Sequence, residues 1–279
     1  MQQPMMHIPD AAHLPHRAPA RMARLVRFLG ALAASLCVAS AHAIPSAQEI
    51  LAASDAVRNP DFPFGLTNTL IEYRNGKQTD TSTLAIYSKA EATGGQFRSL
   101  IRFVAPARDA GKLMLYSGRD LWFYDPTNKA SIRLSPQQRL LGQASNGDVV
   151  TVNLAKDYKA TQAGEEDMQD GEKKMRHCYK LSLSALTPEV SYHHIEIWID
   201  TSNNQPVKSR FYAESGKLLK TAYYRKFQKH LGHDRPTETV IIDGLDTSWV
   251  TVMRFSDWVK REVPDAWLQR DYLPRFKPE

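Results

Sequence analysis

The sequence contains little cysteine and few long apolar runs. Only two of its 279 residues are cysteine, and Cys178 is the one that lies beyond the first 43 residues. A single cysteine cannot form an intramolecular disulfide, so a hydrophobic core has to hold the fold together. The composition, 42% hydrophobic and 24% charged, suits such a core. Beyond the first 43 residues no apolar run reaches the roughly 20 residues that cross a bilayer as a helix, so we expect this part of the chain to be soluble.

The short motifs of the common enzyme classes are also missing. The sequence has no G-x-S-x-G, H-E-x-x-H, C-x-x-C, Walker or G-x-G-x-x-G pattern. His193 and His194 are adjacent, so in a strand they point to opposite faces and cannot bind one metal; His177 and Cys178 fail as a catalytic pair for the same reason. The acidic run at residues 165–170 lacks the spacing of a calcium loop and is interpreted as a solvated hairpin turn. We therefore expect no catalytic residue, no metal and no cofactor.

The N-terminal region has the layout of a Sec signal peptide. Three arginines precede the apolar run of residues 28–38, which is too short to span a bilayer as a helix. Small residues follow at Ala41 and Ala43, the −3 and −1 positions that signal peptidase requires. We therefore expect residues 1–43 to be an N-terminal extension with a cleaved signal, and residues 44–279 to be a single domain that reaches the periplasm.

The start site and the net charge both depend on this segment. Met22 opens a signal peptide of more conventional length, so translation from Met1 and from Met22 both remain open. The segment up to Ala43 holds four arginines and one aspartate, so its removal lowers the formal charge from +6 to +3. The remaining excess is spread along the chain without a basic block, which argues against nucleic acid as a partner.

Most of the remaining chain shows the alternation of apolar and polar residues that is typical of β-strands. Turn sequences such as Asn75-Gly76 and Ser215-Gly216 separate the runs. Because the connections are short, neighbouring strands are expected to be antiparallel, and about twelve strands are more than one open sheet usually holds without curling. The expected strands are residues 66–74, 81–89, 96–105, 112–117, 120–125, 129–134, 174–184, 191–200, 206–213, 217–228, 236–243 and 248–256.

Four short helices are expected around these strands. Ser46 and Glu49 have the spacing of a capping box, and Ser135 and Gln138 repeat it with proline at the first helical position. Helical insertions between the strands of a curled sheet tend to lie across its opening. The expected helices cover residues 46–58, 135–141, 152–158 and 265–272.

Together these elements predict a mainly β (α+β) fold, in which a single curled antiparallel sheet forms a half-open β-barrel capped by short helices. Its apolar concave face fits either a packed core or a cavity for an apolar ligand. One β-bulge would invert the parity of a strand and make the opposite set of side chains the lining. The ligand-binding candidates are Phe97, Ile101, Phe103, Ile195, Ile197, Phe211, Tyr223, Phe227 and Met253 on the wall, with Leu140 and Leu141 in the helix over the opening.

Two stretches carry a family resemblance. The first reads GRDLWFYDP at residues 118–126 and continues with IRLSPQQR at residues 132–139. The second reads IWID at residues 197–200, QPVK at 205–208 and GKLLKT at 216–221. In order and spacing the chain resembles the outer membrane lipoprotein-sorting protein family, a LolA-like group of periplasmic carriers.

This resemblance implies a LolA-like half-barrel whose apolar interior takes up the acyl chains of lipids or lipoproteins and carries them toward the outer membrane without catalysis. Lipoprotein and free lipid both remain open as cargo. An inner-membrane exporter of the RND or ABC type is implied as a partner, and a monomer is expected. The alternative is a non-catalytic accessory or regulatory subunit that docks to such an exporter or takes part in envelope-stress sensing.

Overall fold

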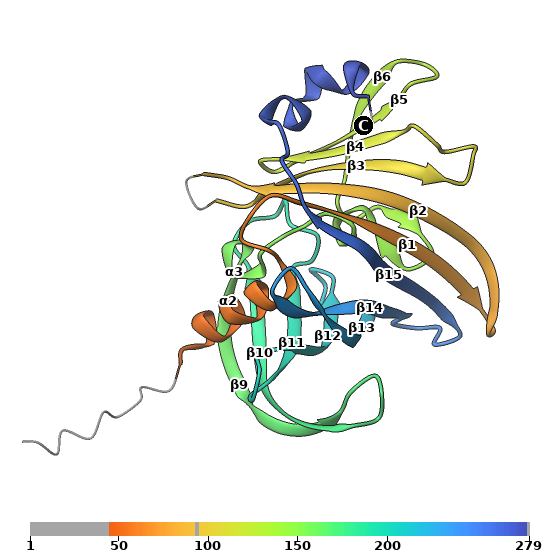
Figure 1. The fold of residues 1–279 in the computed structure, drawn as a ribbon. Coiled ribbons are helices and arrows are strands. Elements are labelled where there is room, and N and C mark those ends of the chain that lie inside the picture. Colours follow the sequence, from red (N-terminus) through yellow and green to blue (C-terminus); the bar gives the residue numbers. More distant parts are fainter. Residues whose placement is uncertain (1–44, 93–94, 278–279) are drawn as a thin grey trace, which may run out of the picture. The chain divides into compact units, whose positions relative to one another are not determined.

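The computed structural model describes residues 45–92 and 95–277, so the predicted signal peptide at residues 1–43 lies outside the described residues. Thirteen strands form one antiparallel sheet, which confirms the predicted fold class (Figure 1). All twelve predicted strands are present. In spatial order the strands are β6 (Ala130–Leu134), β5 (Asp120–Asp125), β4 (Leu113–Ser117), β3 (Phe97–Ala105), β2 (Lys77–Ala90), β1 (Phe64–Arg74), β15 (Trp249–Lys260), β14 (His233–Asp243), β13 (Leu218–His230), β12 (Pro206–Tyr212), β11 (His194–Asp200), β10 (Met175–Ala185) and β9 (Tyr158–Gln169).

The chain builds this sheet as two arms that meet in its middle. The first arm runs outward from β1 to the edge strand β6, and the second runs from the edge strand β9 back to β15, which pairs with β1. Residues 135–157 connect the two edges and are called the cover segment below. This segment contains β7 (Arg139–Leu141), β8 (Ala144–Ser145), the 3-10 helix η1 (Asn146–Asp148) and the short helix α3 (Leu154–Asp157).

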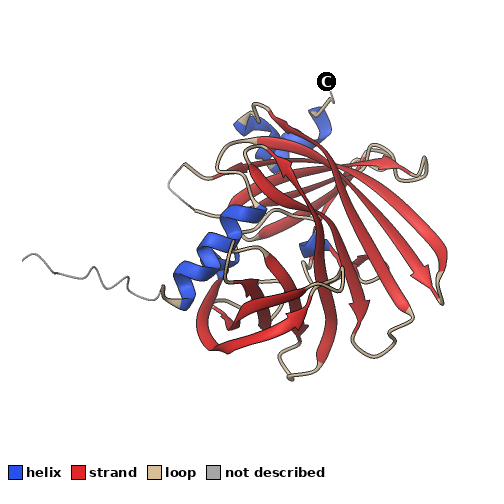
Figure 2. Cartoon of the chain, turned by 60° about the horizontal axis from the view of Figure 1, so that its bottom comes forward, coloured by secondary structure: helices blue, strands red, loops and turns tan. Residues whose placement is uncertain are grey.

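Helix α2 (Ala47–Arg58) confirms the helix predicted over residues 46–58. Its capping box is formed as expected: the Glu49 backbone N donates to Ser46 Oγ at 3.3 Å, and the Ser46 backbone N donates to the Glu49 carboxylate at 2.8 Å. Ile50 and Leu51 are buried in the core on the concave side of the sheet. Figure 2 shows the strands curling and α2 lying against that side.

The two faces of the sheet carry separate hydrophobic cores. The concave core includes α2, the cover segment and inward residues of most strands, among them Leu70, Ile197 and Met253. The convex core is smaller and is covered by the 3-10 helices η2 (Asp265–Leu268) and η3 (Arg270–Arg275). The predicted terminal helix at residues 265–272 is therefore present, in 3-10 rather than α-helical form.

The helix predicted over residues 135–141 is wrong. Gln138 N donates to Ser135 O at 3.2 Å and closes a single turn, after which the chain forms the β7–β8 hairpin. Leu140 and Leu141 consequently lie in a short strand, partly buried against the concave core. The helix predicted over residues 152–158 is present only as α3, which is four residues long.

Long-range contacts explain why this hairpin replaces the predicted helix. Gln143 N donates to Thr251 Oγ1 at 2.7 Å, and Lys220 Nζ donates to Gln143 O at 2.9 Å. Gly142, at a φ of +56°, lies so close to Thr251 that a Cβ atom would collide with its hydroxyl. The capping-box spacing is a local signal, whereas these partners come from distant strands and satisfy the buried backbone of the hairpin.

Strand β9 was not predicted. The acidic run that was interpreted as a hairpin turn lies mostly within this strand, where Glu165, Glu166 and Asp167 pair with β10. Asp170 alone of that run lies in the turn, where it accepts from Glu172 N at 2.8 Å and Lys174 N at 2.9 Å. Most of β9 is exposed at the edge of the sheet, so burial imposes no alternation of apolar and polar residues on it.

A candidate ligand cavity under the cover segment

A cavity of about 180 Å³ lies between the concave face and the cover segment. Its wall comes from both arms of the sheet, with Leu66 and Ile86 from the first arm and Ile241 from the second. Val149 and Val150 of the cover segment close it on the other side. These five side chains are buried and apolar, whereas other parts of the wall are polar, so the cavity is a partly open space with a mainly apolar lining.

The residues predicted for ligand binding fall into three groups. Ile195, Phe211 and Met253 line the cavity. Tyr223 and Phe227 do not line it. The remaining six belong to the concave core without lining this cavity: Phe97, Ile101, Phe103 and Ile197 are fully buried in it, and Leu140 and Leu141 pack against it.

Strand β13 differs from the expected parity. Ala222, which is 2% exposed, and Tyr224 line the cavity, and Lys220 lies on the same face. Tyr223 therefore projects from the opposite face, where Lys208 Nζ lies 5.6 Å from the centroid of its ring. The aromatic residues Tyr223 and Phe227 suggested the wrong face because the inward face of this strand carries a lysine and a small alanine.

A buried polar network fastens the cover segment to the second arm. The Lys220 ammonium forms an ion pair with Asp148 of η1, and Lys220 is only 4% exposed. Tyr192 Oη donates to Asp148 Oδ1 at 2.7 Å, and Ser145 N donates to Asp148 Oδ2 at 2.7 Å. Burial lowers the pKa of Lys220 and raises that of Tyr192, while the negative charge of Asp148 offsets part of the effect on the lysine. The network satisfies every charge that it buries.

Comparison with known proteins shows which family has this architecture. A family model described as "Uncharacterized protein" matches residues 95–275. The crystal structure of a LolA superfamily protein from Nitrosomonas europaea shares 33% sequence identity, covers 82% of this chain and 100% of its own, and superimposes with a TM-score of 0.74. The chain belongs to the LolA superfamily.

Two further solved structures share the fold of this LolA superfamily member. A putative outer membrane lipoprotein-sorting protein domain from Vibrio parahaemolyticus is 19% identical, covers 82% of this chain and 98% of its own, and has a TM-score of 0.69. A DUF1329 family protein from Desulfovibrio piger is 22% identical, covers 81% and 97%, and has a TM-score of 0.69. No curated protein sequence matches the chain.

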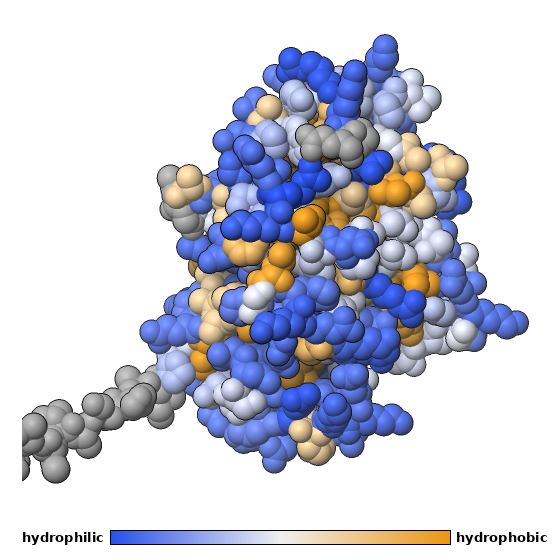
Figure 3. Space-filling view, in the orientation of Figure 1, coloured by the Kyte–Doolittle hydropathy of each residue, from blue (hydrophilic) through white to orange (hydrophobic). Residues whose placement is uncertain are grey.

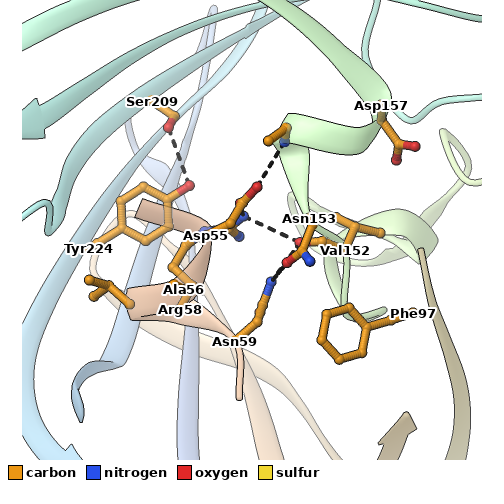
Figure 4. Close-up of polar contacts among 12 residues, drawn as sticks. Asp55, Ala56, Arg58, Asn59, Phe97, Val152, Asn153, Asp157, Ser209 and Tyr224 are labelled. Atoms are coloured by element: carbon orange, nitrogen blue, oxygen red, sulfur yellow. Dashed lines mark hydrogen bonds and ion pairs between the residues drawn. The ribbon is translucent and has the colours of Figure 1, made fainter. Parts of the chain in front are cut away.

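In this LolA superfamily chain, the end of α2 forms a second fastening of the cover segment (Figure 4). Asp55 accepts from Ala155 N at 2.8 Å and forms an ion pair with Arg58. Asn59 Nδ2 donates to Val152 O at 2.9 Å and to Asn153 Oδ1 at 2.7 Å. Burial raises the pKa of Asp55, although Arg58 opposes this shift. Both ends of the cover segment are therefore held by polar contacts to distant elements.

Asp157 is one of the polar residues on the wall of the mainly apolar cavity. Gln96 Nε2 donates to its carboxylate at 3.0 Å, and burial raises the pKa of the carboxyl group. Tyr116 also lines the cavity, and burial raises the pKa of its hydroxyl to about 12. The carboxylate of Asp157 can accept a hydrogen bond from a ligand or bind a positively charged group.

On the face shown in Figure 3, apolar side chains form small separate patches within a mostly hydrophilic surface. Within the part of the chain that the structure describes, no helix is long and apolar enough to cross a bilayer. Among the same residues, no group of three or more histidine, cysteine or acidic side chains is arranged to hold a metal ion.

Proposed function

We propose that this LolA superfamily protein is a periplasmic carrier that binds the acyl chains of a lipid or lipoprotein in the cavity and delivers them toward the outer membrane. The supporting observation is the partly open, mainly apolar cavity between the sheet and a separately fastened cover segment. A closely packed core has few voids larger than a water molecule, so an apolar space of about 180 Å³ calls for a functional explanation.

The size of the cavity constrains how a ligand enters. An engineered apolar cavity of about 150 Å³ stays dry and binds benzene, so a space of this size accepts a short apolar group. A full acyl chain needs more room, and the cover segment is the part that can supply it, because side-chain contacts hold η1 to strand β13 and α3 to helix α2. Each buried CH₂ group contributes about 0.8 kcal/mol, so partial burial of a chain already supports reversible binding.

The positions of the side chains suggest which residues contact the acyl chain. Ile195, Phe211 and Met253 are proposed as wall residues that contact the acyl chain, together with Ala222. Phe97, Ile101, Phe103 and Ile197 are proposed to extend the wall when the cover segment moves, and Leu140 and Leu141 to move with it. An inner-membrane exporter of the RND or ABC type is proposed as the donor. No step of this carrier function requires a catalytic group.

The first experiment extracts the exported protein with organic solvent and identifies whatever co-purifies by mass spectrometry. Ala222→Phe fills the cavity without adding a polar group, and we expect it to lower the bound lipid or acylated peptide at least about tenfold. Ala130→Phe makes the same change on the exposed edge strand β6 and should leave the occupancy unchanged. Circular dichroism confirms that both variants fold.

An empty extract from well-folded wild-type protein would contradict the carrier function. It would favour the alternative of a non-catalytic accessory subunit that docks to an exporter or to an envelope-stress regulator. Equal loss of ligand in both variants would contradict the assignment of the cavity as the binding site.

A further inference from the structure

One charged group on the cavity wall has no direct ion-pair partner among the described residues; the only charge that opposes the rise in its pKa is the more distant one of Arg119, which pairs with Glu189. Asp157 lies at the end of α3 and lines the cavity. Among the described residues, no lysine, arginine or histidine nitrogen lies within 4.0 Å of its carboxylate. The other charged residues on the wall are all paired: Asp148 with Lys220, Glu189 with Arg119 at 3.4 Å, and Arg58 with Asp55.

The charge of Asp157 is not needed for the local structure. Gln96 already connects its strand to the cover segment, because its Oε1 accepts from Asn153 N at 2.8 Å and its Nε2 donates to Asn153 O at 3.0 Å. The contact from Gln96 Nε2 to Asp157 could equally be accepted by the neutral amide of an asparagine. Burial penalises the ionised form of the carboxyl group and raises its pKa. An ionised carboxylate at this position therefore lowers stability, and the local hydrogen bonds do not require its charge.

We propose that Asp157 selects ligands that carry an ammonium group, which it binds while the acyl chain occupies the apolar part of the cavity. This inference rests on the proposed carrier function. An ammonium group would supply a direct counterion and form a charge-assisted hydrogen bond with this partly buried carboxylate, and such bonds are stronger than neutral ones. The amine headgroup of a phospholipid and a lysine of an acylated peptide share this chemistry.

The test uses three amphiphiles with the same ten-carbon chain: decylamine, decanol and decanoate. Isothermal titration calorimetry on the exported protein at pH 7 measures their affinities below the concentrations at which they form micelles. We expect decylamine to bind at least about tenfold more tightly than decanol, and decanoate to bind most weakly. Asp157→Asn should abolish the preference for the amine while keeping the affinity for decanol.

Asp120→Asn is the matched control, because it makes the same change in an exposed residue of β5 that pairs with Arg133 at 2.5 Å and lies outside the cavity wall. It should keep the preference for the amine. Equal affinity for decylamine and decanol in the wild type would overturn the inference while leaving the carrier function intact. If none of the three amphiphiles binds, the carrier function itself fails. If Asp157→Asn does not fold, the wild-type series still decides between these outcomes.

The source of the ammonium group is identified by a second pair of measurements. Lysophosphatidylethanolamine is compared with lysophosphatidylglycerol of the same chain length, and an acylated peptide containing lysine is compared with its alanine counterpart. A preference within the first pair supports a lipid headgroup as the ligand, and a preference within the second supports an acylated polypeptide. The absence of a preference in both pairs would overturn the inference.

Discussion

The two faces of the sheet are covered in different ways. On the convex face, Trp267 packs edge-on against Phe276 at 5.0 Å between ring centroids and against Tyr87 at 5.5 Å, and the nearby core residues Leu100 and Leu115 are fully buried. On the concave face, the cover segment lies over a cavity and is fastened by the buried Lys220–Asp148 pair. Both covers pack apolar side chains onto the sheet, but only the cover on the concave face lies over a cavity and is fastened by a buried ion pair, because the ion pairs of Asp265 on the convex face are exposed.

We interpret the convex face as the part of the sheet that provides stability, and the covered concave face as the part that serves ligand binding. Apolar packing is non-directional and is lost only when the whole layer opens. Polar contacts are directional, and a few of them decide whether a segment is in place. A cover held by a small number of such contacts can open without unfolding the sheet, which is what the entry of a ligand requires. Three substitutions test this separation.

The largest effect is expected for Trp267→Ala on the convex face. Removing a large, nearly buried aromatic side chain should lower the free energy of unfolding by about 3–5 kcal/mol, measured by urea denaturation. Binding of the ten-carbon amphiphiles should not change, because the whole sheet lies between this residue and the cavity. A parallel loss of ligand affinity in folded protein would show that the two faces are coupled.

A smaller effect is expected for Lys220→Met. Asp148 keeps its hydrogen bonds from Ser145 N and Tyr192 Oη, so the free energy of unfolding should fall by about 1–3 kcal/mol. Amide hydrogen exchange should accelerate at residues 142–148 and stay unchanged in β4 beneath Trp267. Uniform acceleration across both regions would contradict a separate fastening of the cover. The double variant with Asp148→Asn measures the coupling within the pair.

The smallest effect is expected for Asp157→Asn. Burial raises the pKa of Asp157 in the folded protein above its unfolded value, so this group stabilises the fold at low pH and loses that contribution as pH rises through the folded pKa. Asparagine does not ionise, so the variant avoids this loss of stability. Its free energy of unfolding at pH 7 should exceed that of the wild type by less than about 1 kcal/mol, because the carboxyl group of Asp157 keeps partial contact with solvent. The gain should vanish near pH 4. A difference in urea midpoints that is independent of pH would contradict this assignment.

Much of the fold was predictable because burial leaves a clear signature in the sequence. Alternating residues such as Ile195 and Ile197 revealed the strands, and the capping box at Ser46 and Glu49 revealed α2. The edge strand β9 lacks that signature because solvent reaches most of its residues. Strand β9 pairs with β10 through backbone hydrogen bonds, which any side chain allows, so this pairing leaves no alternation of apolar and polar residues in the sequence of β9.

The candidate site was predictable only in part. Ile195, Phe211 and Met253 were expected on the wall and lie there, because a run of inward apolar residues fixes their face. Ala222 and Tyr224 were missed, since both faces of β13 carry aromatic residues and the inward face also carries Lys220. A buried lysine is rare enough that only its partner, Asp148, 72 residues earlier in the chain, accounts for it.

The sequence by itself determined twelve of the thirteen strands of the sheet and their antiparallel order, because these depend on local periodicity and short connections. The tertiary structure decided the conformation of the cover segment, the face of β13 that looks inward and the isolation of Asp157 on the cavity wall. Each of these depends on hydrogen bonds and ion pairs between residues far apart in the chain, which local patterns do not encode.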